Sequence, residues 1–349
     1  MTPSRRTLLI FILPVACVYA IWASYMTATG QWGLFATKYY MTITMIFGSF
    51  IAGATPEGGG AVAFPVMTLV YAIPPEIARN FSLAIQSIGM GAATLWIIAR
   101  RVPVETTYLK IALVASTLGV LVASFWIAPL VPPKFSKMMF VTFWLAFGIA
   151  LFFINHIRKR QAVDSLPGLS QAQVAELLAV GFIGGCFSGV LGNGVDICTF
   201  AYVTMKYNLS EKVATPTSVI LMASNAWVGN LTHFFLLRDV QPAVIDYWLV
   251  CIPVVMLGVP FGAYFMSRVP RLVIAWTLYV IITVQFIGAL LILKPTGSLA
   301  LGSALVFLLG IVLFFGLTLQ SGRAAAAKPT AGGQARKRRG PGLHPRPPA

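Results

Sequence analysis

The sequence predicts an all-α polytopic membrane protein made of two inverted repeats. Hydrophobic residues make up 58% of the 349 residues and charged residues only 10%, whereas a soluble domain carries roughly a quarter charged residues. Apolar runs of about 20 residues, enough to cross a bilayer core, recur along the chain. An internal repeat without gaps, at a spacing of about 136 residues, then indicates that one membrane unit occurs twice.

Each copy of the repeat contains a glycine-rich break inside an apolar segment, at residues 53–60 and 189–196. The match continues beyond the breaks, where five residues of the first copy fall on identical residues of the second: Phe64 on Phe200, Thr68 on Thr204, Tyr71 on Tyr207, Ala78 on Ala214 and Ser82 on Ser218. Apolar segments broken by glycine at corresponding positions of two halves are typical of a transporter's binding site.

The first half of the chain divides into a leading helix and repeat 1. Residues 1–38 hold a first transmembrane helix and a loop; a cleaved signal peptide is the alternative, but the apolar run is long for one. Within repeat 1, residues 39–160, the two short arms of the broken segment predict a hairpin that re-enters the membrane. The predicted parts are the hairpin at 40–71 and full spans at 76–99, 105–130 and 137–155.

Polar residues 161–171, which include Pro167 and Gly168, predict a cytoplasmic linker before repeat 2, residues 172–293. Repeat 2 is expected to contain a hairpin at 174–205 and spans at 212–237, 243–266 and 272–293, followed by a last helix at 298–319. The basic tail, 323–349, cannot build a core and is expected to be disordered. A nucleic-acid patch is the alternative for its Arg/Lys cluster, but a cytoplasmic anchor is favoured and no nucleic-acid partner is expected.

The basic clusters set the topology, because cytoplasmic loops carry an excess of Lys and Arg. Placing Arg158–Arg160 in the cytoplasm and counting with re-entrant hairpins puts every strong basic cluster, and both termini, on that side. The hairpins then enter from opposite faces, so the repeats are inverted. If each hairpin were a single broken span, Arg5 and Arg6 would move outside.

Two hairpins that enter from opposite faces bring two glycine-rich tips together near the middle of the membrane. Glycine lets a substrate approach the backbone closely, and the start of a half-helix attracts anions. The substrate-binding candidates at the tips are Gly58, Gly59, Gly60, Ala61, Gly192, Asn193 and Gly194. Close helix packing is the alternative role for these glycines.

Three further candidates for anion binding have ordinary structural alternatives. Arg79 is a possible anion clamp or an interfacial anchor that reaches the headgroups. Ser82 and Ser218 occupy matching positions and can donate to an anion or bond their own helices.

Glu57 and Asp196 are the acids nearest the tips and the candidates for proton coupling. A carboxylate at membrane depth is energetically costly, so its presence there indicates a function. The alternatives are a solvated hairpin end for Glu57 and a helix cap for Asp196.

No residue pattern indicates an enzyme, a metal site or a cofactor. The four cysteines lie in apolar segments without a C-x-x-C pair, the three histidines are scattered, and no P-loop occurs. Transport would therefore use a gradient or a partner.

The glycine-rich tips resemble the TauE/SafE family of sulfite exporters, also called toluene sulfonate uptake permeases. The resemblance rests on the first tip with Phe64–Leu69 and Ala78–Ser82, and on the second with Gly181–Gly185, Gly189–Gly192 and Ala214–Ser218. It covers about residues 40–293. It implies secondary transport of sulfite, a sulfonate or a related organosulfur anion across the bacterial inner membrane.

The sequence therefore predicts a multi-pass permease of the inner membrane, with a small anionic substrate and the lipid bilayer as partners. An anion channel and a permease for an organic carboxylate are the alternatives, and a membrane scaffold without transport is a third. A homo-oligomer is compatible with such a chain.

Overall fold

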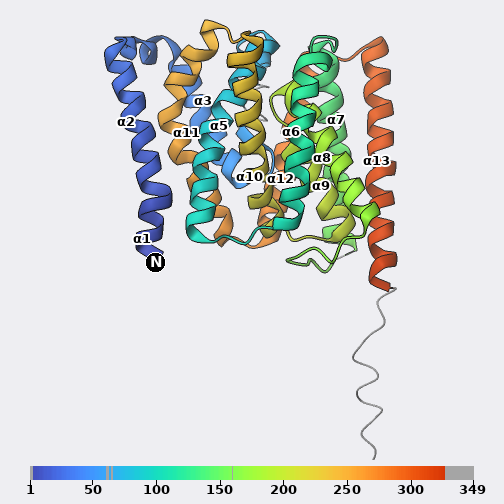
Figure 1. The fold of residues 1–349 in the computed structure, drawn as a ribbon. Helices are drawn as coiled ribbons and strands as arrows, with labels where there is room; N and C mark the ends of the chain where they lie inside the picture. Colours follow the sequence, from blue (N-terminus) through green and yellow to red (C-terminus); the bar gives the residue numbers. More distant parts are fainter. Residues whose placement is uncertain (1–2, 60–62, 64–65, 159, 327–349) are drawn as a thin grey trace, which may run out of the picture.

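The computed structural model describes residues 3–59, 63, 66–158 and 160–326, and in this part the helices lie side by side as one bundle (Figure 1). Gly60, Ala61 and residues 327–349 of the predicted tail lie outside the described residues. The predicted all-α fold is confirmed for the described part of the chain.

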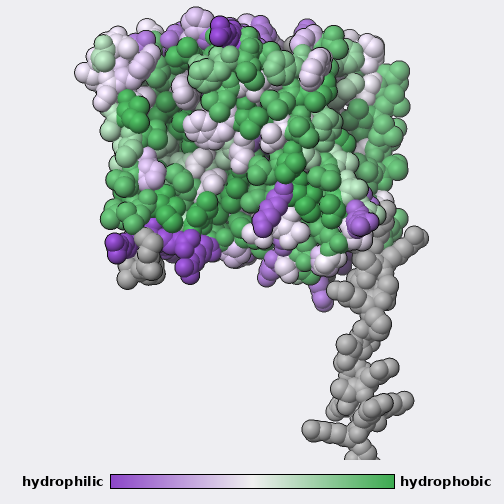
Figure 2. Space-filling model, in the orientation of Figure 1, coloured by the Kyte–Doolittle hydropathy of each residue, from purple (hydrophilic) through white to green (hydrophobic). Residues whose placement is uncertain are grey.

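Nine helices of the described chain are long and apolar enough to cross a membrane: Arg5–Ala28, Pro75–Arg100, Thr106–Ile127, Lys134–Ile157, Gln171–Leu191, Glu211–Leu237, Pro242–Arg268, Arg271–Leu293 and Gly297–Leu319. Large apolar side chains on the outer helices are exposed, among them Leu291 and Val312. In the view of Figure 2, a hydrophobic band runs between two edges where hydrophilic residues gather. The prediction of a polytopic membrane protein is therefore confirmed.

The chain builds its helical elements, with short π-helical (η) and 3-10 stretches, in this order: α1 (Pro3–Thr7), η1 (Leu8–Ile12), α2 (Leu13–Ala28), η2 (Gln31–Gly33), α3 (Leu34–Ala54), η3 (Val66–Val70), α5 (Pro75–Arg100), α6 (Thr106–Val122), η4 (Ala123–Ile127), α7 (Pro133–Phe152), η5 (Phe153–Ile157), α8 (Gln171–Leu191), α9 (Val195–Tyr207), α10 (Glu211–Leu231), η6 (Thr232–Leu237), α11 (Pro242–Arg268), α12 (Arg271–Leu293) and α13 (Gly297–Ala326). The last helix thus continues past 319, where the sequence prediction ended it.

Local sequence explains several of these boundaries. Proline stands at the first position of α5, α7 and α11, where its missing N–H is not needed. Ser170 and Gln173 form a capping box at the start of α8. Lys38 has non-helical dihedral angles and kinks α3, so the straight part of α3 begins close to residue 40.

The second broken segment is a helical hairpin. Gly192 and Gly194 have φ angles of 80° and 139°, which turn the chain between α8 and α9. The Tyr202 hydroxyl donates to Glu176 Oε2 at 2.5 Å, so the end of α9 lies beside the start of α8. With 13 residues, α9 reaches only about 20 Å at 1.5 Å per residue, too short for a hydrocarbon core of about 30 Å.

The first broken segment also returns to the end from which it started. α3 stops at Ala54, and Gly58 adopts a φ of 67°. The rings of Tyr40 and Tyr71, at the two ends of the segment, lie 4.7 Å apart between centroids. The Thr44 and Tyr71 hydroxyls are hydrogen-bonded at 3.2 Å.

The two hairpins open toward opposite ends of the bundle. Tyr40, at the mouth of the first, is hydrogen-bonded to Tyr247 near the start of α11, hydroxyl to hydroxyl at 3.3 Å. At the mouth of the second, Arg160 donates to the Thr204 carbonyl at 2.7 Å. Arg271, which follows the end of α11, contacts the Arg160 carbonyl at 3.4 Å. The mouths are therefore separated by the length of α11.

Candidate functional site

The tips of the two hairpins meet inside the bundle. The Asn193 side-chain amide donates to the backbone carbonyl of Glu57 at 2.7 Å. Gln86 of α5 donates to the Gly192 carbonyl at 2.8 Å. Gly58, Gly192 and Asn193 are all buried. The structure thus brings the described candidates from both tips into one buried site, with α5 against it.

The first glycine of each break has a different role from the glycines in the turns. A Cβ atom at Gly53 would lie 1.8 Å from the Val259 carbonyl oxygen, and one at Gly189 would lie 2.6 Å from the Ala123 Cβ. These two glycines permit close helix packing. Gly192 and Gly194 adopt dihedral angles that side chains disfavour, and α9 begins directly after them, at Val195.

Glu57 is fully buried and its side chain is held by donors from two other helices. Its Oε1 accepts from the Trp144 indole at 2.8 Å, and its Oε2 accepts from the Gln285 amide at 2.6 Å. Both carboxylate oxygens are therefore satisfied by neutral N–H donors from α7 and α12. Glu57 does not lie at a solvated hairpin end.

Asp196 is also fully buried, but only one of its carboxylate oxygens is satisfied. Its Oδ1 accepts from the Ile197 backbone N–H at 3.0 Å, while Oδ2 has no hydrogen-bond partner among the described residues. The helix α9 begins at Val195, and Gly194 is its N-cap residue. Asp196 therefore lies inside the first turn.

The three remaining candidates occupy different places. Ser82 lies at the site, because its Oγ accepts from Gln86 Nε2 at 3.1 Å. A Cβ atom added at Gly192 would lie only 2.7 Å from the Ser82 Cβ atom. Ser218 Oγ donates to the Thr215 carbonyl of its own helix at 2.9 Å. Arg79 forms an ion pair with Asp239 at 3.2 Å, at the end of the bundle where the first hairpin opens.

A cavity of about 540 Å³ leads from that end toward the second tip. Its lining includes Arg79 and Asp239 near the loops, Ser124 and Ser136 on the walls, and Val190 and Leu191 beside the tip. We call this cavity the vestibule. Arg79 is its basic side chain and is paired with Asp239, and Glu76 is a second acid in the lining.

A comparison with protein families agrees with this architecture. The model of the family described as sulfite exporter TauE/SafE matches residues 40–291, from the start of the first hairpin almost to the end of α12. The chain belongs to the TauE/SafE family. No curated protein and no solved structure matched the chain.

The family assigns this TauE/SafE protein to membrane transporters of the sulfite-exporter type. Among the residues that the structure describes, no group of three or more His, Cys, Asp or Glu side chains is placed to hold a metal ion.

Four polar residues that the sequence patterns did not indicate lie in or near the site of this TauE/SafE protein. Gln86, Trp144 and Gln285 hold the tips directly. Lys137 of α7 is 5% exposed and donates to Thr68 of the first hairpin at 2.5 Å. A polar residue inside an apolar span was the only available signal, and the spans contain other polar residues that bond only their own helices.

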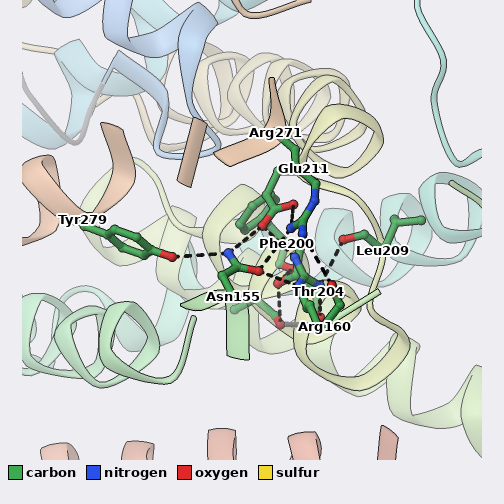
Figure 3. Close-up of polar contacts among 9 residues, drawn as sticks. Asn155, Arg160, Phe200, Thr204, Leu209, Glu211, Arg271 and Tyr279 are labelled. Carbon is green, nitrogen blue, oxygen red and sulfur yellow. Dashed lines mark hydrogen bonds and ion pairs between the residues drawn. The ribbon is translucent and has the colours of Figure 1, made fainter. Parts of the chain in front are cut away.

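An ion-pair network lies at the end of the TauE/SafE protein where the second hairpin opens (Figure 3). Glu211 is fully buried and binds Arg160 at 2.6 Å and Arg271 at 3.5 Å. Asn155 bridges the group, because it donates to Glu211 at 3.0 Å and accepts from Arg160 at 2.8 Å. The network ties the end of α9 to α10, α12 and the chain after α7.

Proposed function

We propose that this protein is a secondary transporter that moves a small anion, sulfite or a sulfonate, across the bacterial inner membrane. Binding would take place between the two hairpin tips, near the start of α9. The observation that carries this proposal is the hydrogen bond between Asn193 and the Glu57 carbonyl, because it joins two glycine-rich tips at a buried point of the bundle. Backbone N–H groups at a helix start suit an anion.

The two halves would be an inverted repeat. Residues related by a two-fold axis can contact each other only next to that axis, and Glu57 and Asn193, 136 residues apart, are equivalent in the repeat. Packing supports the same relation: Gly53 lies on Val259, and its equivalent Gly189 lies on Ala123, which is the counterpart of Val259. Inverted repeats around a central site are a common design of secondary transporters.

The end with the ion-pair network would face the cytoplasm. Arg6 donates to the Ile98 carbonyl near the end of α5 at 3.0 Å, so the first basic cluster lies beside Arg100 and Arg101. The N-terminal end of the described chain and the far end of α13 lie at the same edge (Figure 1). A shared basic edge agrees with the positive-inside rule.

The vestibule and the network support alternating access. The vestibule reaches the second tip from one side, and the ion pairs of Glu211 close the other. A carrier must expose its site to one side at a time, so the network would have to open or move as a unit when the site turns inward.

Uptake into proteoliposomes tests the proposal, with sulfite, a panel of sulfonates and a panel of carboxylates, with and without a pH gradient. We expect saturable uptake of an organosulfur anion that follows the gradient. Uptake that saturates weakly and ignores the gradient would favour the anion channel. Uptake of carboxylates alone would assign the site to an organic carboxylate instead.

A further inference from the structure

Two buried oxygen atoms, one from an amide and one from a carboxyl group, lie against the same point beside Gly58. A Cβ atom at Gly58 would be 2.3 Å from Gln86 Oε1 and 3.0 Å from Asp196 Oδ2. Neither oxygen has a hydrogen-bond partner among the described residues, and both residues are at least 98% buried, with exposed fractions of 2% and 0%. Two such acceptors repel each other unless a hydrogen lies between them.

The Gln86 amide cannot remove this conflict by turning over. Its Nε2 donates to the Gly192 carbonyl at 2.8 Å and to the Ser82 carbonyl at 3.0 Å. Both partners are backbone acceptors, so a reversed amide would place an oxygen against two carbonyl oxygens. The network therefore fixes Oε1 on the side of Asp196, and a hydrogen on the Asp196 carboxyl would remove the conflict.

Glu57 is placed differently. Its two oxygens accept from the Trp144 indole and the Gln285 amide, and an indole N–H can only donate. This is the environment of an ionised carboxylate. Two neighbouring buried carboxyl groups are not easily ionised together. The donors around Glu57 favour its ionised form, whereas the unpaired oxygen of Asp196 favours the protonated form.

The other titratable groups that face Asp196 do not supply a positive charge. They are Glu57 across the tips, Tyr108 of α6 and Cys198 of its own helix. No ion pair of Asp196 with Lys, Arg or His occurs among the described residues. An ionised Asp196 would thus have only the start of α9 to stabilise it.

We propose that Asp196 and Gln86 form the proton-binding site of the transporter, in which the Asp196 carboxyl carries the coupled proton and donates a hydrogen bond to Gln86 Oε1, directly or through one water molecule. The proposal rests on the function proposed above and names its coupling ion and the acceptor that holds it. Protonation makes the start of α9 neutral and allows an anion to bind there. Loss of the proton restores a carboxylate that repels the anion, which links the two transport steps.

Infrared spectroscopy of the purified protein tests the proton site without any substrate. We expect the carbonyl band of a protonated carboxylic acid at neutral pH, its loss in Asp196→Asn and its persistence in Glu57→Gln. Gln86→Leu should keep the band but move it to higher frequency, because the carboxyl loses its acceptor. The Gln86→Leu result is informative even if Asp196→Asn folds poorly.

Three spectroscopic outcomes would overturn the proposal: a wild-type protein without the band, a band that survives Asp196→Asn, or one that Glu57→Gln removes. Sodium is the competing ion for two facing oxygens. Thermal stabilisation by sodium chloride over choline chloride, present in the wild type and absent in Asp196→Asn, would assign the oxygens to sodium instead.

Transport assays separate this proposal from the assignment of the substrate. For any anion that the wild type carries, Asp196→Asn should retain anion exchange at equal pH on both sides and lose accumulation driven by a pH gradient. Gradient-driven accumulation by Asp196→Asn at the wild-type level would overturn the proton site. If no organosulfur anion were transported while the infrared band of Asp196 was present, only the proposed substrate class would be rejected.

Discussion

The Asn193 side chain donates a hydrogen bond to the backbone carbonyl of Glu57, its own counterpart in the other half of the chain, at 2.7 Å. Both groups are buried, so no solvent replaces the bond when it is lost. This contact joins the two hairpins at their tips.

Asn193→Ala should destabilise the protein and reduce transport, because the Glu57 carbonyl loses its donor. An unsatisfied buried carbonyl costs about 1–3 kcal/mol, which thermal unfolding in detergent would detect. Asn225→Ala is the matched control: this buried amide donates to Ser116 at 2.7 Å, between α10 and α6. The control should lose similar stability and keep its transport rate. Equal transport by both variants would contradict a special role for the tips.

Gly58→Ala should abolish transport. The substitution adds a Cβ atom 2.3 Å from Gln86 Oε1 at a residue with a φ of 67°. The backbone would therefore be strained, and the added atom would overlap the Gln86 side chain. Gly30→Ala has the same strain, with a φ of 66°, but no atom lies within 4 Å of its Cβ position. Both variants pay about 1–2 kcal/mol for the left-handed conformation, and only Gly58→Ala should lose uptake in proteoliposomes.

Glu211→Gln should strongly destabilise the protein. The substitution leaves Arg160, which is 9% exposed, without its counter-charge, and breaking a buried ion pair costs about 3–5 kcal/mol. Glu176→Gln removes a pair with Lys206 in which the glutamate side chain is 46% exposed, and an exposed pair contributes only about 0–1 kcal/mol. Unfolding temperatures that fall equally in the two variants would show that the network is not important for stability.

Arg79→Gln should weaken anion transport mainly through KM. Arg79 is the basic residue of the vestibule lining, and its loss should raise KM by on the order of tenfold, equivalent to ~1.4 kcal/mol. Arg238→Gln is the control, because Arg238 lies at the same end of the bundle but does not line the vestibule. The difference between the variants should shrink at high salt, since salt screens exposed charges.

The ion pair of Asp239 should stabilise the protein at neutral pH and lose this effect only at acidic pH. Partial burial raises the pKa of the Asp239 carboxyl, but the hydrogen bond with His233 and the charges of His233 and Arg79 outweigh this effect and hold the pKa below its usual value. A carboxyl with a lowered folded pKa stabilises the protein above its unfolded pKa, about 3.9, and the contribution is lost as the pH falls through the folded pKa.

The difference in unfolding temperature between wild type and Asp239→Asn should therefore shrink as the pH falls below about 4. A difference that already shrinks between neutral and mildly acidic pH would show that another group is responsible. Thermal unfolding in detergent across this pH range provides the measurement.

The sequence by itself determined the class of the protein, because hydrophobic length and glycine are local properties. A span needs about 20 apolar residues, and the helices of the described chain begin and end near the expected positions. The repeat also pointed to the tips of the hairpins. In the structure, Gly58, Gly192 and Gly194 at these tips have positive φ angles.

Only the tertiary structure decided which polar side chains complete the site. Gln86, Trp144 and Gln285 come from three helices that are distant in sequence, and their roles depend on the direction in which each amide or indole N–H points. Ser218 matches Ser82 in the repeat, yet Ser82 packs against Gly192 of the second tip, whereas Ser218 bonds only the Thr215 carbonyl of its own helix. Spacing along a chain does not specify such contacts, because a hydrogen bond requires distances and angles that arise when the helices pack.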